Sequence, residues 1–75
     1  MNLQQVRRVR EQAPFKAFTL FLTDQRRFEI RHPDFIWLVP GGLSIGVAHD
    51  DGTAEFIDPR HITTLKLAGA NGEES

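Results

Sequence analysis

Three histidines stand close in the sequence to a carboxylate, and these pairs are the first feature that could do chemistry. The pairs are His32 with Asp34, His49 with Asp50, and His61 with Asp58. Histidine together with carboxylate suits zinc, nickel or iron. However, the histidines show no His-x-His or His-x₃-His spacing, and all three fall where strands are expected to end. We therefore expect these side chains to bond the backbone at turns, with no metal and no cofactor.

Catalytic motifs are missing from the sequence. It has no cysteine, which excludes disulfides and thiolate–zinc sites, and it has no G-x-S-x-G or His-Glu-x-x-His motif. The segment PGGLSIG, residues 40–46, bears glycines but lacks the lysine and the following helix of a phosphate-binding loop. A domain of this length also offers little room for a ligand pocket of about 300–1,000 Å³. We therefore expect that the protein is not an enzyme.

Basic residues form a second candidate site. The arginines that could contact a nucleic acid are Arg7, Arg8, Arg10, Arg26, Arg27 and Arg60. Nucleic-acid binders place such residues on one face beside aromatic side chains that stack on bases, and Trp37 is the best candidate for stacking. The net charge is −1, and Glu11, Asp24 and Glu29 dilute the positive field. Nucleic-acid binding is therefore kept as an alternative function.

The N-terminal segment is predicted to form a short helix with one apolar stripe. The stripe consists of Leu3, Val6, either Val9 or Arg10, and Ala13. Asn2 is a favourable N-cap, and Pro14 is expected to end the helix because the residue before a proline avoids the α region. A helix this short is unstable alone, so its stripe is expected to dock on the rest of the protein.

The rest of the chain alternates apolar and polar residues with the period of a β-strand. The expected strands cover residues 18–23, 27–31, 35–39, 43–49, 54–58 and 62–67. Asp24, the PGG segment at 40–42 and the DDG segment at 50–52 mark tight turns. The PRH segment at 59–61 is expected to form a short helical turn.

The segment EIRHPDFIWLVPGG, residues 29–42, interrupts the alternation. Pro33 is expected to fix a bend, and Asp34 is expected to cap that bend by bonding the backbone two residues on. The run FIWLV at 35–39 has no alternation, which predicts a strand buried on both faces. Trp37 is then either a core residue or the first place to look for a partner.

Together these elements predict a mainly β fold, α+β by count. An N-terminal helix is followed by a five- to six-stranded antiparallel sheet in meander order, strongly bent or closed into a small barrel. One domain covers residues 1–68, and the acidic tail 69–75 is expected to be disordered. FIWLV is too short to span a bilayer, and the N-terminal segment lacks the apolar region of a secretory signal. A cytoplasmic location without a membrane partner is expected.

Three stretches of the sequence resemble a family of small bacterial proteins of unknown function, of about 75 residues. These stretches are PFKAFTLFLTD, RFEIRHPDFIWLVPGG and DGTAEFIDPRHITTLKL. The resemblance covers residues 3–67 and rests on a Pro-Phe pair, a HP-D/E-F bend and a terminal I-D-x-x-x-I-T strand. Its motifs are structural, so it implies a fold rather than an activity. Gln25 stands where the family pattern favours glycine, which predicts a different type of first turn.

The expected architecture is also similar to SH3-like barrels and to the Sm-like barrel, a ring-forming RNA-binding fold. Asp34 matches the Asp of the Sm pattern Asp-x-hydrophobic-x-Asn, but Trp37 or Leu38 stands where asparagine is needed. Arg60 lacks the glycine that follows the Sm arginine. The resemblance therefore implies Sm-like bending of the strands, with a nucleic-acid-binding ring protein as the alternative function.

The preferred function is a non-enzymatic protein–protein interaction or self-assembly module. A core this small often gains stability from oligomerisation, and open sheets leave edge strands that must be covered, charged or paired. We expect residues 43–49 or 54–58 to pair across a subunit interface, in a homo-oligomer or with a protein partner. The candidate interface residues are Trp37, Phe21, Ser44, Gly46 and Ala48.

Overall fold

Short alternating segments of the chain become the strands of a mostly β protein with one helix. The computed structural model describes residues 3–68. The predicted N-cap Asn2 and the predicted disordered tail 69–75 lie outside the described residues. In chain order the elements are α1 (Leu3–Arg10), β1 (Phe18–Leu22), β2 (Arg27–Ile30), the 3₁₀ turn η1 (Pro33–Phe35), β3 (Ile36–Leu38), β4 (Ile45–Ala48), β5 (Ala54–Ile57), the 3₁₀ turn η2 (Pro59–His61) and β6 (Ile62–Leu67).

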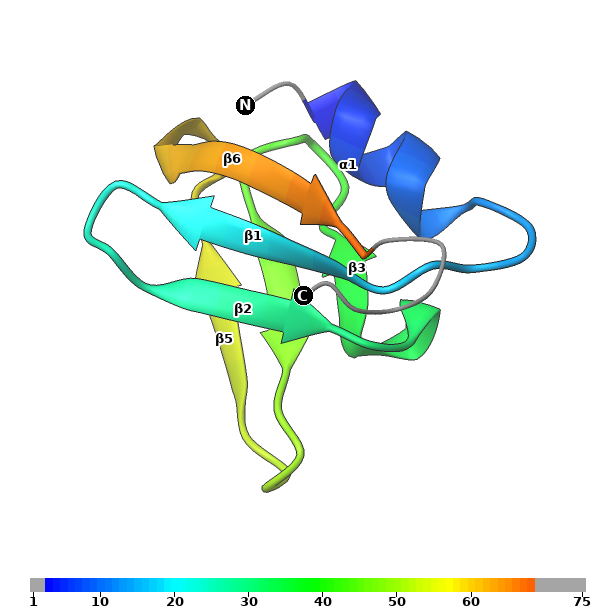
Figure 1. Ribbon diagram of the computed structural model, residues 1–75. Coiled ribbons are helices and arrows are strands. Elements are labelled where there is room, and N and C mark those ends of the chain that lie inside the picture. Colours follow the sequence, from blue (N-terminus) through cyan, green and yellow to red (C-terminus); the bar gives the residue numbers. More distant parts are fainter. Residues whose placement is uncertain (1–2, 69–75) are drawn as a thin grey trace.

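The six strands form two antiparallel three-stranded sheets. One sheet has the order β2-β1-β6, here called the β1 sheet, and the other has the order β3-β4-β5, here called the β4 sheet. The strands of the β1 sheet lie across those of the β4 sheet, and α1 lies at one end of this arrangement (Figure 1). The prediction of a mainly β fold with an N-terminal helix is therefore confirmed.

Two predicted hairpins are present, and each turn has one residue in the left-handed region of backbone conformation. In the β1–β2 turn this residue is Gln25, with a φ of 73°, and in the β4–β5 turn it is Gly52, with a φ of 89°. The DDG segment therefore places its glycine where a side chain is disfavoured. Gln25 adopts a conformation that favours glycine, at the position where the resembled family pattern has glycine.

The meander order is correct for β1 and β2 and for β3, β4 and β5, but it is wrong between β2 and β3, which do not pair, and wrong for the last strand. β6 pairs with β1, so that Leu65 lies opposite Leu20 and Leu67 lies opposite Phe18. The register of this pairing shifts between Phe21 and Leu22, which marks a bulge. Within residues 3–68 no ladder joins the two sheets, so a single five- to six-stranded sheet or a closed barrel is not confirmed.

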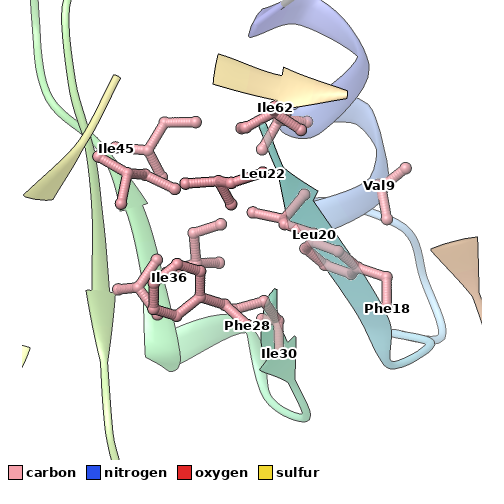
Figure 2. Packing of buried hydrophobic residues seen from close by; sticks show 12 residues of the cluster. Val9, Phe18, Leu20, Leu22, Phe28, Ile30, Ile36, Ile45 and Ile62 are labelled. Carbon is pink, nitrogen blue, oxygen red and sulfur yellow. The ribbon is translucent and has the colours of Figure 1, made fainter. Parts of the chain in front are cut away.

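The core lies between the two sheets and under the helix. Leu20, Leu22 and Phe28 of the β1 sheet face Ile36 and Ile45 of the β4 sheet (Figure 2). The helix contributes two of the buried side chains, and the complete set is Val6, Val9, Phe18, Leu20, Leu22, Phe28, Ile30, Ile36, Ile45, Val47, Ile57 and Ile62. The predicted docking of the helical stripe is thereby confirmed for its two valines. The helix itself ends at Arg10, earlier than the predicted end before Pro14.

The prediction that FIWLV is buried on both faces is wrong. Only Ile36–Leu38 form the strand β3, and Ile36 is 1% exposed whereas Trp37 is 37% exposed. The reason is that the core lies on one face of the β4 sheet only, so Trp37, which alternates with the buried Ile36 along β3, points to the other face. Two neighbouring residues of one strand therefore have opposite environments.

The two prolines that precede β3 and β6 each open a 3₁₀ turn. The predicted helical turn at 59–61 is confirmed as η2, and Asp58 caps it by accepting a hydrogen bond of 2.8 Å from the Arg60 backbone N–H. The same role was predicted for Asp34 in η1, and this prediction is wrong. The η1 turn has no side-chain cap, and the Asp34 carboxylate lies 3.8 Å from His32 Nδ1 instead.

In the part of the chain that the structure describes, no helix has the length and apolar character needed to cross a membrane.

Candidate interaction surface

A row of three residues crosses the outer face of the β4 sheet. Gly46 in the central strand lies opposite Trp37 on one side and opposite Phe56 on the other. The indole of Trp37 occupies the space above Gly46, because a Cβ atom at Gly46 would lie 2.3 Å from Trp37 Cε2. The rings of Trp37 and Phe56 meet edge to face, with centroids 5.8 Å apart and an interplanar angle of 90°. The glycine thus allows two aromatic side chains to meet over the middle of the sheet.

The rest of this face carries small, uncharged side chains. Ala48 lies opposite Ala54 in the adjoining row, and Ser44 shares the face by the alternation of side chains along the strand. Phe56 is 64% exposed. We call this surface the aromatic face, and its members are Trp37, Ser44, Gly46, Ala48, Ala54 and Phe56. An exposed apolar patch of this kind is typical of an interaction site.

The structure brings together four of the five predicted interface residues, namely Trp37, Ser44, Gly46 and Ala48. The fifth, Phe21, lies in β1 of the other sheet and is partly buried. The sequence reasoning missed Phe56, the most exposed aromatic side chain of the aromatic face. In the short run AEFI, Phe56 and Ile57 are adjacent apolar residues, so alternation alone does not indicate which of them faces the core.

The backbone groups of β5 that point away from β4 belong to Ala54 and Phe56. The His49 N–H donates to the Thr53 carbonyl at 2.8 Å, so these two residues form a hydrogen-bonded pair. Because hydrogen-bonded and non-hydrogen-bonded pairs alternate in an antiparallel ladder, Ala54 and Phe56 fall in non-hydrogen-bonded pairs with β4. Their N–H and C=O groups therefore lie along the outer edge of the β4 sheet.

A side chain of the helix binds one backbone acceptor on the other edge of the same sheet. The Nε of Arg10 donates a hydrogen bond of 2.8 Å to the carbonyl oxygen of Ile36, on the outer edge of β3. This contact uses a backbone acceptor that an edge strand otherwise leaves open, and it holds α1 beside the sheet. Arg10 was predicted to contact nucleic acid, and it has instead a role within the fold.

The edges of the β1 sheet carry the features that discourage strand pairing. Along β2, Arg27 and Glu29 place charged side chains on the edge. Along β6, the edge carries Lys66 and the bulge opposite Phe21 and Leu22. Charged side chains and bulges both protect an edge from another chain. The edge of β3 has no charged side chain, but Arg10 bonds its backbone. Among the four sheet edges formed by residues 3–68, β5 is therefore the one with neither a bulge nor a side chain bonded to its outer backbone groups.

The only carboxylate in β5 is bound within the chain. Glu55 accepts a hydrogen bond of 3.0 Å from Arg26 Nη1, and its other oxygen lies 2.8 Å from His49 Nε2. Arg26 belongs to the β1–β2 turn, so this cluster joins the two sheets across their seam. Arg26 also binds Asp24, so the cluster keeps a negative charge, but the Glu55 side chain is held at the seam between the two sheets.

The six predicted nucleic-acid contacts do not form one free basic surface. Arg10, Arg26 and Arg60 are engaged by Ile36, by Asp24 and Glu55, and by Asp58 respectively. Arg7 and Arg8 are exposed on α1, and Arg27 is exposed on β2. The helix and the β1–β2 turn lie at opposite ends of the molecule in Figure 1. The positive charges are therefore spread out and partly used by the fold.

The three histidines are separated rather than gathered at one site. His49 contacts Glu55, and His61 Nδ1 lies 3.4 Å from the Thr23 hydroxyl. His32 lies near Asp34, as described above. Within residues 3–68 no group of three or more histidine and carboxylate side chains is placed to hold a metal ion.

An open hollow of about 390 Å³ lies between β2 and the start of the β4–β5 turn. Phe28, Phe35 and Val47 supply its apolar walls. Its remaining lining residues are charged or titratable, namely Arg27, Glu29, Arg31, His49 and Asp50. Arg31 and Asp50 form an ion pair across it. The lining of the hollow therefore contains both arginines and carboxylates, and their formal charges cancel.

The strongest electrostatic perturbation lies at the η2 turn. The Arg60 guanidinium donates hydrogen bonds to both carboxylate oxygens of Asp58, the shortest of them 2.7 Å long. These bonds, together with the Arg60 backbone N–H, lower the pKa of Asp58 to about 2. The same ion pair raises the pKa of Arg60 above its ordinary value. The pair stabilises a local turn and holds no group in a state suited to acid–base catalysis at neutral pH.

The fold and this surface define a small, mostly β protein with an uncovered sheet edge beside an aromatic face. Comparison with protein-family models, with curated proteins and with solved structures returns no significant match.

Proposed function

We propose that the protein is a non-enzymatic protein–protein interaction or self-assembly module that works through the β4 sheet. One observation carries the proposal: the unprotected edge of β5 lies next to the exposed rings of Trp37 and Phe56. An edge strand presents a row of unpaired N–H and C=O groups, which another strand can pair with. Aromatic side chains are enriched at the centres of protein interfaces.

A nucleic-acid-binding ring protein is the alternative. The exposed Trp37 supports it, because an aromatic side chain can stack on a base. The engagement of Arg10, Arg26 and Arg60 within the fold weakens it, because phosphate contacts need free cations. This proposal also includes the resemblance to small bacterial proteins and the cytoplasmic location. It keeps the comparison with SH3-like and Sm-like barrels as well. The crossed packing of two short-stranded sheets supports the comparison with small barrels.

Site-specific photocrosslinking in the native cell tests the proposed function. A photoreactive phenylalanine analogue at position 56 is expected to join the chain to a protein, because this position lies at the centre of the proposed surface. The matched control carries the analogue at Arg8, which is exposed on the helix. Equal and weak crosslinking at both positions would show that the β4 sheet has no partner. Crosslinking of position 56 to RNA, abolished by raised salt, would favour the alternative.

A further inference from the structure

We infer that β5 pairs with β5 of a second copy of the chain, in an antiparallel manner about a two-fold axis. The result is a dimer whose two β4 sheets form one continuous six-stranded sheet. This inference rests on the proposed function and names the partner of the same surface. It follows from the direction of the backbone groups in β5, from the charges beside them and from the state of the other edges.

The free backbone groups of β5 fit such a pairing. In a hydrogen-bonded pair of an antiparallel ladder, two residues exchange both of their N–H···O bonds. Phe56 directs its N–H and C=O away from β4, so it can form this pair with Phe56 of the second copy. The row Trp37, Gly46 and Phe56 then continues across the two-fold axis into the same row of the second copy.

The distribution of charge selects this register. With Phe56 on the axis, Glu55 of each chain lies opposite Ile57 of the other. If Glu55 lay on the axis instead, two carboxylates would face each other directly, which destabilises a strand pair. The contacts of Glu55 with Arg26 and His49 also hold the only charged side chain of β5 at the seam with the β1 sheet, where it does not select a basic partner. A strand with the same apolar outer residues is therefore the best match.

The other edges of the chain are poor partners for β5. The edge of β3 already accepts Arg10, β2 carries Arg27 and Glu29, and β6 carries Lys66 and a bulge. A head-to-tail contact between β5 and one of these edges would have to displace or accommodate these features. Pairing of β5 with β5 of a second copy requires no such change. Because this contact uses the same edge on both copies, it gives a closed dimer.

The interface is small, so the dimer is expected to be weak. The four residues of β5 span about 14 Å at roughly 3.4 Å per residue. The contact is therefore smaller than the roughly 800 Å² that each partner buries in a stable complex. We expect a dissociation constant of about 0.1 mM, in the range of weak contacts.

Sedimentation equilibrium of the whole chain, from about 10 μM to about 1 mM, measures this association directly. The expected result is a rise in mass from monomer to dimer. Ala54→Pro removes an N–H that points to the new strand but not to β4, and it is expected to raise the dissociation constant at least tenfold. Glu29→Pro makes the same change on the edge of β2 and is expected to leave the constant unchanged. Circular dichroism verifies that both variants remain folded.

A disulfide tests the register. The chain has no cysteine, so Phe56→Cys introduces a single thiol. Residues of a hydrogen-bonded antiparallel pair have Cα atoms about 5.5 Å apart, within the range that a disulfide spans. Mild oxidation is therefore expected to link two copies much faster through position 56 than through Leu43→Cys, whose side chain is 82% exposed in the native chain. Equal rates at the two positions would overturn the register.

Failure of this inference can be told apart from failure of the proposed function. A chain that stays monomeric up to about 1 mM, but whose position 56 crosslinks to a different protein in the cell, contradicts self-pairing and supports the interaction module. A trimer or larger assembly also contradicts the two-fold pairing. A monomer without any crosslinked partner contradicts both.

Discussion

Trp37 lies flat over Gly46, and no residue with a Cβ atom fits at position 46 while the indole stays in place. Gly46 was predicted to lie at an interface with another chain. In the structure a side chain of the same chain already lies over its backbone. Because position 46 is glycine, the indole of Trp37 can lie on the backbone of the central strand β4 and contact the ring of Phe56 on β5.

Gly46→Ala is expected to displace the indole of Trp37 and to lower the free energy of unfolding by about 1–2 kcal/mol, as for overpacking. The displaced ring becomes more exposed, so the tryptophan fluorescence shifts to longer wavelength. Urea denaturation followed by fluorescence measures both effects on the only tryptophan of the chain.

The double variant with Trp37→Ala is the control for this prediction. If the cost of Gly46→Ala comes from the indole, the same substitution costs less when position 37 is alanine. A cost that is the same in both backgrounds would mean that the backbone of Gly46, and not Trp37, requires glycine.

Arg10→Ala is expected to lower the free energy of unfolding by about 1–2 kcal/mol, because it removes a charged donor from the Ile36 carbonyl and loosens the helix. Amide exchange of Val6 and Val9 should become faster, since both valines depend on the docked helix. Arg8→Ala on the exposed side of α1 is the matched control and is expected to change stability by less than about 0.5 kcal/mol. Equal effects of the two substitutions would contradict a specific role for Arg10.

Asp58→Ala is expected to lower the melting midpoint by a few degrees, because it removes the cap of the η2 turn before β6. Asp34→Ala is the matched comparison at the other 3₁₀ turn, where the carboxylate makes no capping bond. The midpoint of the Asp34 variant is expected to stay close to that of the native chain. Thermal melting followed by circular dichroism compares the two, and a larger loss for Asp34→Ala would contradict the assignment of the cap.

Stability is expected to fall as the pH is lowered below about 4, and Asp58 contributes to this loss. Its pKa in the folded protein is about 2, below the ordinary value for an aspartate, so the ionised form stabilises the fold. The stabilisation is complete above the unfolded value and is lost as the pH falls through the folded value. Asp24 and Asp51 act in the same direction, because hydrogen bonds with Arg26 and with Thr53 lower their pKa values.

Asp58→Asn isolates the contribution of this carboxylate. Denaturation midpoints measured from neutral to acid pH are expected to fall less steeply for the variant than for the native chain. Identical pH profiles would show that the ion pair between Asp58 and Arg60 does not contribute to the acid dependence.

Local structure was largely predictable because it depends on neighbouring residues. Alternation places Phe18, Leu20 and Leu22 on one face of β1, and the structure buries all three. The glycine of the DDG turn and the proline of the PRH turn act through their own backbone angles, so both turns appear where they were expected. The two aspartates differ in their place relative to proline: Asp58 precedes Pro59 and is the N-cap of its turn, whereas Asp34 follows Pro33 and is not. The prediction for Asp34 did not take this difference into account.

The candidate surface was predictable only in part. Alternation grouped Ser44, Gly46 and Ala48 on one face, but it did not show that β4 is the central strand of its sheet. Residues 43–49 therefore cannot offer a free edge, and of the two predicted segments only 54–58, which contains β5, remains available. Arg10, Arg26 and Arg60 looked like free cations because their acceptors lie elsewhere in the chain or depend on the turn geometry.

By itself the sequence determined the helix, the strands, the turns and the set of residues that share each strand face, because a period of two or 3.6 residues is a local property of the backbone. Only the tertiary structure decided which strands became neighbours and which faces were covered. Pairing of β6 with β1 joins segments from the two ends of the described chain, and it leaves β5 at an edge. Exposure of Trp37 and Phe56 follows from that arrangement, since a side chain is buried only where another layer of the fold lies over it.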